Sequence, residues 1–200
     1  WSSDVCSSDL MSITATDFST GIPVLKSVAV IDICNLFVAR MCVVSALELG
    51  CGDGGMVARL GVLNREGIDL WQPSLDVCNR LYPDVVTRCA DVREIGRLYK
   101  PRSRDLVCGF DILEHMEYLE AQRVIEAAER IAARGVMWWG PLEDTPRRFP
   151  DEPNPLMQHV RCIDLAEFAD RGYELITFPN YWTEEGSIGA TAFLAMKDCR

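Results

Sequence analysis

Three of the glycines and two of the carboxylates between residues 48 and 69 have the types and spacing of a ligand-binding turn. Gly50, Gly52 and Gly55 follow an apolar run and precede a helix-like segment. Glycines permit positive φ values and let a ligand approach backbone N–H groups at the N-terminus of a helix. Glu48 lies two residues before the first glycine and Asp69 lies 19 residues after it, so the turn is flanked by two groups that can accept hydrogen bonds from a ligand.

The charge of Glu48 restricts the class of ligand that this turn can hold. Taken literally, the three glycines satisfy the G-x-G-x-x-G fingerprint of a dinucleotide site, with Asp69 as its downstream acid. A carboxylate directed into the turn would repel a pyrophosphate and would attract a ligand that carries an ammonium or a sulfonium. The Tyr-x-x-x-Lys pattern of one class of short dehydrogenases is absent as well. An NAD-binding Rossmann oxidoreductase stays the less favoured alternative.

Two further aspartates extend this series of carboxylates. Apolar runs predict strands at 43–49, 67–71, 85–90 and 105–110. Asp91 and Asp111 directly follow the third and fourth of these strands, much as Glu48 and Asp69 lie at the ends of the first two. Ligands of parallel α/β sheets bind beyond the carboxyl ends of the strands, so we expect all four carboxylates to converge on one crevice.

The remaining elements alternate in a way that predicts an α/β fold. Further helices are predicted at 24–41, 56–60, 73–81, 117–133 and 163–169, and further strands at 136–139, 173–178 and 190–196. Alternating strands and helices give a mostly parallel sheet covered on both faces, with right-handed crossovers. The last two strands are joined without a helix and should form an antiparallel pair at one edge. A proline-rich insertion at 140–161 is predicted to be irregular.

The residues that carry these features resemble a known family in their order and spacing. They are residues 48–54, which read ELGCGDG, with Asp69, Asp91 and the run from Asp105 to His115. Across 43–200 this pattern is similar to that of the class I S-adenosylmethionine-dependent methyltransferases. The resemblance implies a Rossmann-like three-layer αβα sandwich. Its seven-stranded, mostly parallel sheet would have the order 3-2-1-4-5-7-6, with the last strand antiparallel.

The resemblance also implies S-adenosyl-L-methionine as the cofactor and assigns residues to its parts. These residues are Glu48, Gly50, Cys51, Gly52, Gly109 and Asp111 at the methionine end, Asp69 at the ribose, and Leu70, Asp91 and Val92 at the adenine. Asp69 would accept hydrogen bonds from both ribose hydroxyls, and Asp91 would bind the adenine amino group. Three alternatives stay open: Asp69 could simply end a strand, Asp91 could cap the next helix, and Trp71, placed near the adenine, could be a core residue.

The two histidines of the chain are the candidate catalytic residues. Methyl transfer from a sulfonium is a direct displacement, which requires alignment of the nucleophile and needs a general base only if a proton must leave early. His115 lies four residues after Asp111, and His159 lies near the end of the insertion. A positioning role for His115 and a packing role for His159 are the alternatives. The expected acceptor is a small molecule that is methylated on an oxygen or a nitrogen atom.

The acceptor site should come from segments that the cofactor motifs do not use. These segments are 11–42, 140–161 and 179–189. Phe149, Tyr181 and Trp182 within them suit an apolar or ring-bearing acceptor, although all three could be ordinary packing residues. Two rival classes remain: a module that binds S-adenosylmethionine without turnover, and an aminopropyltransferase, which would need more acidic residues around a polyamine channel.

Length and charge restrict the partners of the chain. Its 200 residues suit one domain, and we divide them into a leader at 1–10, a helical segment at 11–42 and the binding domain at 43–200. A formal charge of −10 and a pI near 4.7 argue against a nucleic-acid partner. The most apolar stretch is interrupted by Asp32 and Arg40, so no membrane span is expected.

The cysteines indicate the compartment and the absence of a zinc site. Nine cysteines are scattered singly without any C-x-x-C pair, so neither zinc nor any other metal is expected. Unpaired cysteines of this kind are typical of a reducing, cytoplasmic compartment. Residues 1–10 repeat Ser-Ser-Asp without periodicity and are interpreted as a leader that is not native to the protein.

Overall fold

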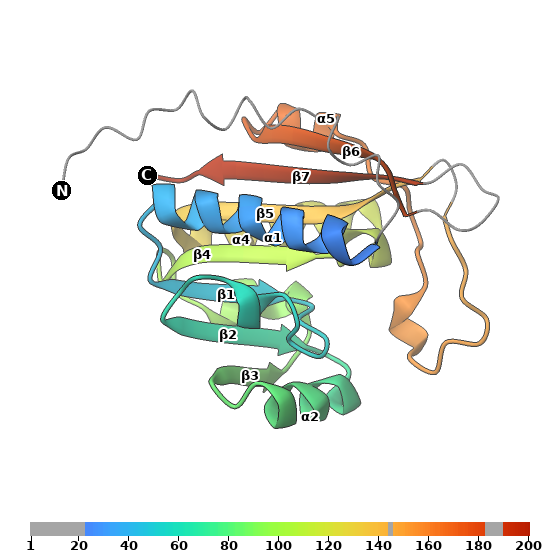
Figure 1. The fold of residues 1–200 in the computed structure, drawn as a ribbon, viewed down its shortest axis with the longest axis horizontal. Helices are drawn as coiled ribbons and strands as arrows, with labels where there is room; N and C mark the ends of the chain where they lie inside the picture. Colours follow the sequence, from blue (N-terminus) through green and yellow to red (C-terminus); the bar gives the residue numbers. More distant parts are fainter. Residues whose placement is uncertain (1–22, 144–145, 183–189) are drawn as a thin grey trace.

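The computed structural model describes residues 23–143, 146–182 and 190–200, which form a sheet with helices on both faces (Figure 1). The predicted leader at 1–10, the start of the 11–42 segment and most of the 179–189 loop lie outside the described residues. The strands are β1 (Ser45–Leu49), β2 (Asn64–Asp69), β3 (Val85–Cys89), β4 (Arg104–Phe110), β5 (Ala132–Leu142), β6 (Glu174–Trp182) and β7 (Ala190–Asp198).

The seven strands have the predicted order, β3-β2-β1-β4-β5-β7-β6. β1 to β5 pair in parallel, and β7 runs antiparallel between β5 and β6. The predicted fold class, a Rossmann-like three-layer αβα sandwich, is therefore confirmed. The carboxyl ends of the parallel strands share one edge of the sheet, on the side toward which the insertion extends (Figure 1). This is the edge at which such sheets bind their ligands.

Helices bury the two faces of the sheet in separate apolar clusters. α1 (Pro23–Arg40) covers one face, where Cys34, Phe37 and Val38 pack with side chains of β4, β5 and β7. α4 (Tyr118–Ile131) covers the other face with buried residues that recur every three or four positions. The short helices are α2 (Gln72–Leu81), α3 (Ile95–Leu98) and α5 (Ala166–Ala169), and the 3-10 turns are η3 (Val57–Arg59), η4 (Val92–Glu94), η5 (Leu113–His115) and η6 (Pro155–Met157).

The helix predicted directly after the glycine turn is wrong, because only the three-residue turn η3 forms there. Leu60 leaves the helical region with ψ 134°, and both Leu60 and Val62 are buried. Burial of these apolar side chains draws the chain back to the sheet, where β2 begins at Asn64 instead of the predicted 67. Tertiary burial thus outweighs local helix propensity in this segment.

β5 is longer than the strand predicted at 136–139 and includes Pro141. β4 pairs with β5 as far as Trp139, whereas β7 pairs with it as far as Leu142. Pro141 therefore lies where one side of β5 has no strand partner, a position at which a sheet tolerates proline. The insertion consequently starts beyond the edge of the parallel sheet. The helix predicted at 163–169 is shortened to the four residues of α5.

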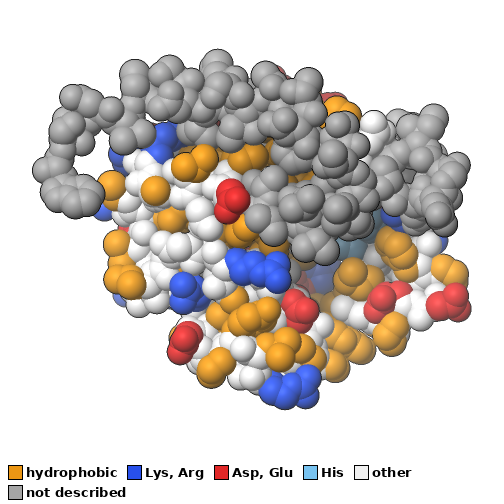
Figure 2. All heavy atoms as spheres, in the orientation of Figure 1, with side chains coloured by type: hydrophobic (Ala, Val, Ile, Leu, Met, Phe, Trp, Pro, Cys, Tyr) orange, Lys and Arg blue, Asp and Glu red, His pale blue; other side chains and the backbone are white. Residues whose placement is uncertain are grey.

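On the face shown in Figure 2, basic side chains of the described residues lie in small separate groups that alternate with acidic ones. That nucleic acid is not a partner stays a prediction from the charge of the chain. No described helix has both the length and the apolar character that crossing a membrane requires.

Candidate functional site

The glycine turn after β1 has a backbone that favours glycine. Gly50, Gly52 and Gly54 have φ values of 68°, 52° and 80°. A Cβ at Gly54 would also lie 2.3 Å from the sulfur of Cys78, so no larger residue fits there. Gly54, and not the Gly55 of the literal fingerprint, is therefore the third glycine that the turn requires.

Glu48 lies beneath this turn and is only 2% exposed. Its Oε2 accepts a hydrogen bond from the Val57 N–H at 2.9 Å, which fixes the chain that leaves the turn. Burial raises the pKa of the Glu48 carboxyl well above its usual range, and repulsion by Asp53, Asp69 and Asp111 raises it further. This concentration of carboxyl groups disfavours an anionic ligand and favours a cationic one.

Asp69, at the end of β2, accepts hydrogen bonds from the backbone of the two turns that follow β1 and β2. Its Oδ2 accepts a hydrogen bond from the Gly52 N–H at 2.9 Å, and its Oδ1 accepts one from the Trp71 N–H at 2.7 Å. A carboxylate offers about four acceptor positions, so two remain for hydroxyl groups of a ligand. Trp71 is half-buried and lies outside the core clusters, which contradicts the alternative that it is a core residue.

Asp91 caps the turn η4 that follows it. Its carboxylate accepts a hydrogen bond from the Arg93 N–H at 2.9 Å. The Arg93 guanidinium binds the same carboxylate, with a closest contact of 2.6 Å, and these hydrogen bonds lower the pKa of Asp91. The capping alternative is thus confirmed, and a ligand at Asp91 would share the carboxylate with Arg93.

One pocket, named here the cofactor pocket, brings together half of the predicted cofactor residues. The predicted residues that line it are Gly50, Asp69, Leu70, Asp91, Val92 and the candidate catalytic residue His115. Four lining residues were missed by the sequence analysis: Arg93, Ile112, Met116 and Leu156. The hydrophobic run after Asp111 could have indicated Ile112 and Met116, but Leu156 comes from the distant insertion and carries no local signal.

The other predicted cofactor residues border this pocket without lining it. Glu48 and Cys51 are buried, and Gly52 contributes its N–H to Asp69. A Cβ at Gly109 would lie 2.7 Å from the Trp138 ring, so glycine permits the close packing of β4 on β5. These residues shape the pocket through the backbone.

Asp111 follows β4 in a strained conformation. Its φ is 50°, which residues other than glycine rarely adopt, and its N–H donates to the Trp139 carbonyl at 2.9 Å. Asp111 is exposed to solvent. Even so, desolvation of its carboxyl group by the surrounding protein raises its pKa, and repulsion by the Glu143 carboxylate raises it further. Strained residues of this kind gather at functional sites, where the surrounding structure holds them in place.

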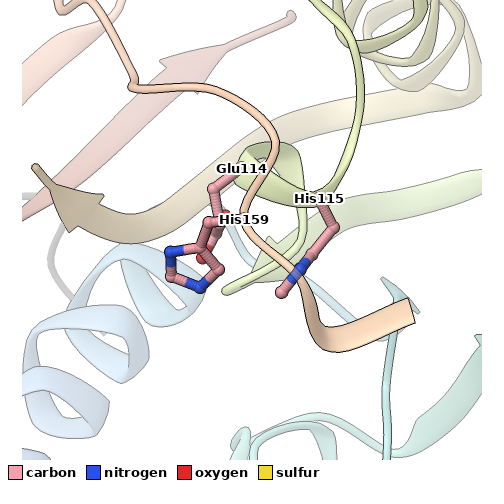
Figure 3. Close-up of side chains that lie close together, drawn as sticks. All are labelled: Glu114, His115 and His159. Atoms are coloured by element: carbon pink, nitrogen blue, oxygen red, sulfur yellow. The ribbon is translucent and has the colours of Figure 1, made fainter. Parts of the chain in front are cut away.

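The fold brings both histidines together (Figure 3). The ring centroids of His115 and His159 are 4.9 Å apart, with the ring planes at 77°. The His115 Nδ1 lies 3.1 Å from the Gln158 carbonyl, and the His159 Nδ1 lies 2.7 Å from the Glu143 carboxylate. Because both partners accept hydrogen bonds, each Nδ1 carries a proton, and in the neutral form of either ring the lone pair is on Nε2. Burial lowers the pKa of His115, which favours its neutral form.

Two glutamates, Glu114 and Glu143, lie beside the two histidines. We name Glu114, His115, Glu143 and His159 the histidine cluster; neither glutamate was a predicted site residue. Glu114 directly precedes His115 and is 2% exposed. Glu143 follows β5, and its contact with His159 depends on the insertion folding back. The Leu-Glu-His run could have indicated Glu114, whereas nothing in the sequence around Glu143 indicates its partner.

Of the three ring-bearing residues predicted for the acceptor side, one packs against this cluster and a second packs against β5. The Phe149 ring lies 5.2 Å from the His159 ring, measured between centroids. Tyr181 lies 4.8 Å from Trp139, the residue whose carbonyl accepts the Asp111 N–H. The side chain of Trp182 lies outside the described residues.

Comparison with protein families identifies the part of the chain that forms this site. Residues 47–138 match the family model described as a methyltransferase domain. This part of the chain therefore resembles a methyltransferase domain. The matched range includes the glycine turn and His115. It also includes the carboxylates at the ends of β1 to β4, which are Glu48, Asp69, Asp91 and Asp111. Comparison of the sequence with curated proteins gave no match.

Solved structures share the fold of this chain. Magnesium protoporphyrin IX methyltransferase from Synechocystis PCC 6803 with bound SAH has a TM-score of 0.61, 15% identity and coverage of 87% of this chain and 84% of that chain. N-methyltransferase NodS from Bradyrhizobium japonicum WM9 has a TM-score of 0.64, 12% identity and coverage of 87% and 96%. The [4+2]-cyclase SpnF has a TM-score of 0.61, 15% identity and coverage of 84% and 80%. At these identities the likeness shows the fold alone.

Proposed function

We propose that the protein uses S-adenosyl-L-methionine to methylate an oxygen or a nitrogen atom of a small molecule. The observation that carries this proposal is the cofactor pocket, where the glycine turn meets Asp69 and Asp91 at the carboxyl ends of the parallel strands. This is the edge at which doubly wound sheets bind nucleotides. The pocket also lies mainly within the range that matches the methyltransferase domain.

The contacts of the pocket suggest how the cofactor would lie. Asp69 would bind the two ribose hydroxyls with the acceptor positions that Gly52 and Trp71 leave open. Leu70 and Val92 would pack on the adenine, and Asp91 would accept a hydrogen bond from its amino group. The methionine end would face Gly50 and the residues behind it: Glu48, Cys51, Gly52, Gly109 and Asp111.

The charges around the turn support a sulfonium ligand over NAD. Glu48 is buried with its pKa raised, and Asp53, Asp69 and Asp111 repel it. A pyrophosphate would add two more negative charges near Asp53, Asp69 and Asp111, whereas a sulfonium and an ammonium would offset the charges of these carboxylates. The proposed cofactor therefore relieves the repulsion that the protein builds into its turn.

Two catalytic roles are compatible with the histidines. The Nε2 atom of His115 or His159, in its neutral form, can accept the proton that a hydroxyl acceptor loses during methyl transfer, or the proton that an ammonium must lose before its nitrogen can attack. Alternatively, the rings position the acceptor, and alignment alone supplies the rate. Phe149 and Tyr181 would then form the apolar part of the acceptor site.

The names of the structural neighbours support a small-molecule acceptor, and one of them defines the main alternative. Magnesium protoporphyrin IX methyltransferase is named for a small-molecule substrate, and NodS is named an N-methyltransferase. SpnF is named a [4+2]-cyclase, so this fold also occurs in a protein named for a different reaction. A module that binds the cofactor without methyl transfer is therefore the second candidate. A cytoplasmic location is part of our proposal and relies on the described cysteines, all of which are free thiols.

Isothermal titration with S-adenosylmethionine, S-adenosylhomocysteine and NAD tests the cofactor. We expect the two sulfur ligands to bind with one site per chain and NAD to give no heat. Tight NAD binding without a response to S-adenosylmethionine would overturn the proposal. Release of S-adenosylhomocysteine in a screen of hydroxyl and amine acceptors then distinguishes transfer from binding alone.

A further inference from the structure

Three side chains of metal-ligating types converge beside the cofactor pocket. Glu114 and His115 come from the turn η5, and His159 comes from the segment after η6 (Figure 3). One donor atom of each lies within 4.8 Å of the donor atoms of the other two. The two imidazoles belong to the only histidines among the 200 residues, and the fold places both here.

Among the described residues, none donates a hydrogen bond to the Glu114 carboxylate, although its side chain is almost completely buried. The residue is 2% exposed, and neither Oε1 nor Oε2 finds a donor. Gly140 in β5 lies beside this carboxylate, because a Cβ at that position would be in ordinary van der Waals contact with Oε2, at 3.4 Å. The Arg161 guanidinium attracts this carboxyl group without donating a hydrogen bond to it, so a cation bound directly to the carboxylate would stabilise its ionised form in the protein interior.

Both imidazole rings are held in the orientation that metal-binding histidines have. His115 donates its Nδ1 proton to the Gln158 carbonyl, and His159 donates its own to the Glu143 carboxylate. Such partners fix the ring and its tautomer, so that the lone pair of Nε2 is directed to the metal. The cluster therefore has both the ligands and the supporting residues of a metal site.

Backbone contacts hold the two contributing segments together. The Glu114 carbonyl accepts hydrogen bonds from the N–H groups of Val160, at 2.9 Å, and Arg161, at 3.4 Å. The Arg161 Nε also donates to the Leu113 carbonyl at 3.2 Å. These contacts fix the distance between η5 and the segment that carries His159, so the three ligands do not depend on a free loop.

We propose that Glu114, His115 and His159 bind a divalent first-row transition metal ion, such as Mn²⁺, Co²⁺ or Zn²⁺. Two imidazoles with one carboxylate suit these ions, whereas Mg²⁺ and Ca²⁺ prefer oxygen ligands alone. Ligands about 2.1 Å from one ion are at most about 4.2 Å apart, so small side-chain rotations close the site. The absence of cysteine pairs predicted that no metal binds, but this set of ligands contains no cysteine.

The position of His115 connects this ion to the proposed reaction. His115 lines the cofactor pocket, so the ion would lie at its border on the side of the insertion. Its open coordination positions would take water or an oxygen atom of the acceptor. This last step depends on the proposed methyltransferase function, whereas metal binding itself does not.

Titration of the metal-free full-length protein with MnCl₂, CoCl₂ and ZnCl₂, in the absence of S-adenosylmethionine, tests the site. We expect one ion per chain for at least one of these metals, and a loss of affinity of at least about tenfold in Glu114→Gln and His159→Asn. Asp84→Asn is the matched control, because it neutralises an exposed carboxylate elsewhere in the fold and should bind like the wild type. Visible absorption of the Co²⁺ complex reports whether nitrogen ligands are present.

Thermal melts of every variant establish that it folds, and the metal should raise the Tm of the wild type and of Asp84→Asn only. Absence of stoichiometric binding by the wild type, or unchanged binding by folded Glu114→Gln and His159→Asn, overturns the site. A parallel titration with S-adenosylmethionine separates the two proposals. Metal binding without cofactor binding contradicts the proposed function and leaves the metal site intact, and the reverse result contradicts only the metal site.

Discussion

The cofactor pocket and the histidine cluster meet at one edge of the sheet, but contacts of very different range assemble them. In the pocket, Asp69 binds the N–H groups of residues 17 positions before it and 2 positions after it. In the cluster, His115 binds a carbonyl 43 residues away, and beside the cluster Arg161 binds a carbonyl 48 residues away. The ends of consecutive strands position the residues of the pocket. The residues of the cluster are positioned by contacts between the insertion and the turn η5.

This difference means that the two sites should respond separately to mutation. The pocket depends on backbone groups that the parallel sheet fixes through its own pairing. The cluster depends on a few side-chain contacts that attach the insertion to η5. A change on the insertion should therefore alter stability and the histidines more than it alters cofactor affinity, and a change at a strand end should do the opposite.

The largest effect is expected at Arg161, which attaches the insertion most strongly. Its Nη1 lies 2.6 Å from Glu167 Oε1, and both side chains are nearly buried. Arg161→Met leaves the Glu167 carboxylate without its cation and should reduce the free energy of unfolding by about 3 kcal/mol. Urea denaturation measures this loss. Cofactor affinity should change less than about threefold, since the strand ends are untouched.

The double variant Arg161→Met/Glu167→Gln controls for the origin of that loss. Because it removes the buried charge as well as its partner, it should recover part of the lost stability. A cofactor affinity that falls tenfold or more in Arg161→Met would contradict the separation of the two sites.

The second effect is the converse change, in the cofactor pocket. Asp69→Ala removes a charged acceptor and should weaken S-adenosylmethionine binding by about 2 kcal/mol, or roughly 30-fold, in isothermal titration. Asp76→Ala, which removes an exposed carboxylate on α2, should leave the affinity unchanged. Equal affinities for the wild type and Asp69→Ala would exclude Asp69 from the site.

The sequence predicted that Gly50, Asp69 and Asp91 converge on one pocket, because the contacts between them follow from local order. Strand, turn and carboxylate repeat along the chain, and the parallel topology then brings the strand ends together. Asp69 and Asp91 were located in this way without any long-range information. The helix expected after the glycine turn was wrong because burial of Leu60 and Val62, a tertiary effect, decides the path of that segment.

The histidine cluster could be predicted only in part, for the same physical reason. Residue type identified His115 and His159 as candidates, but no spacing rule connects residues that an irregular insertion brings together. Glu143 and Leu156 were missed because their roles depend on where the insertion returns. The unpartnered carboxylate of Glu114 is visible only when its surroundings are known.

A pH series tests the electrostatics of the glycine turn. The pKa of Glu48 is raised in the folded protein by burial, so the folded state holds a proton that the unfolded state releases above its own pKa of about 4.3. Stability from this group is complete below that pH and is lost as pH rises toward the folded pKa. Urea denaturation from pH 5 to 7 should therefore show a smaller loss of stability in Glu48→Gln than in the wild type. Parallel pH profiles for the two proteins would contradict the assignment.

The smallest effect distinguishes the two roles of Asp91, which caps η4 and borders the cofactor pocket. Arg93 occupies its carboxylate in a half-exposed ion pair, so Arg93→Ala should change stability by less than about 1 kcal/mol. If Asp91 also binds the adenine amino group, releasing it from Arg93 should strengthen S-adenosylmethionine binding about twofold, and Asp91→Asn should weaken it about fivefold. Isothermal titration of both variants checks this, with melting curves as the control for the cap. Unchanged affinity in both variants, with lower stability in Asp91→Asn, would leave Asp91 as a cap alone.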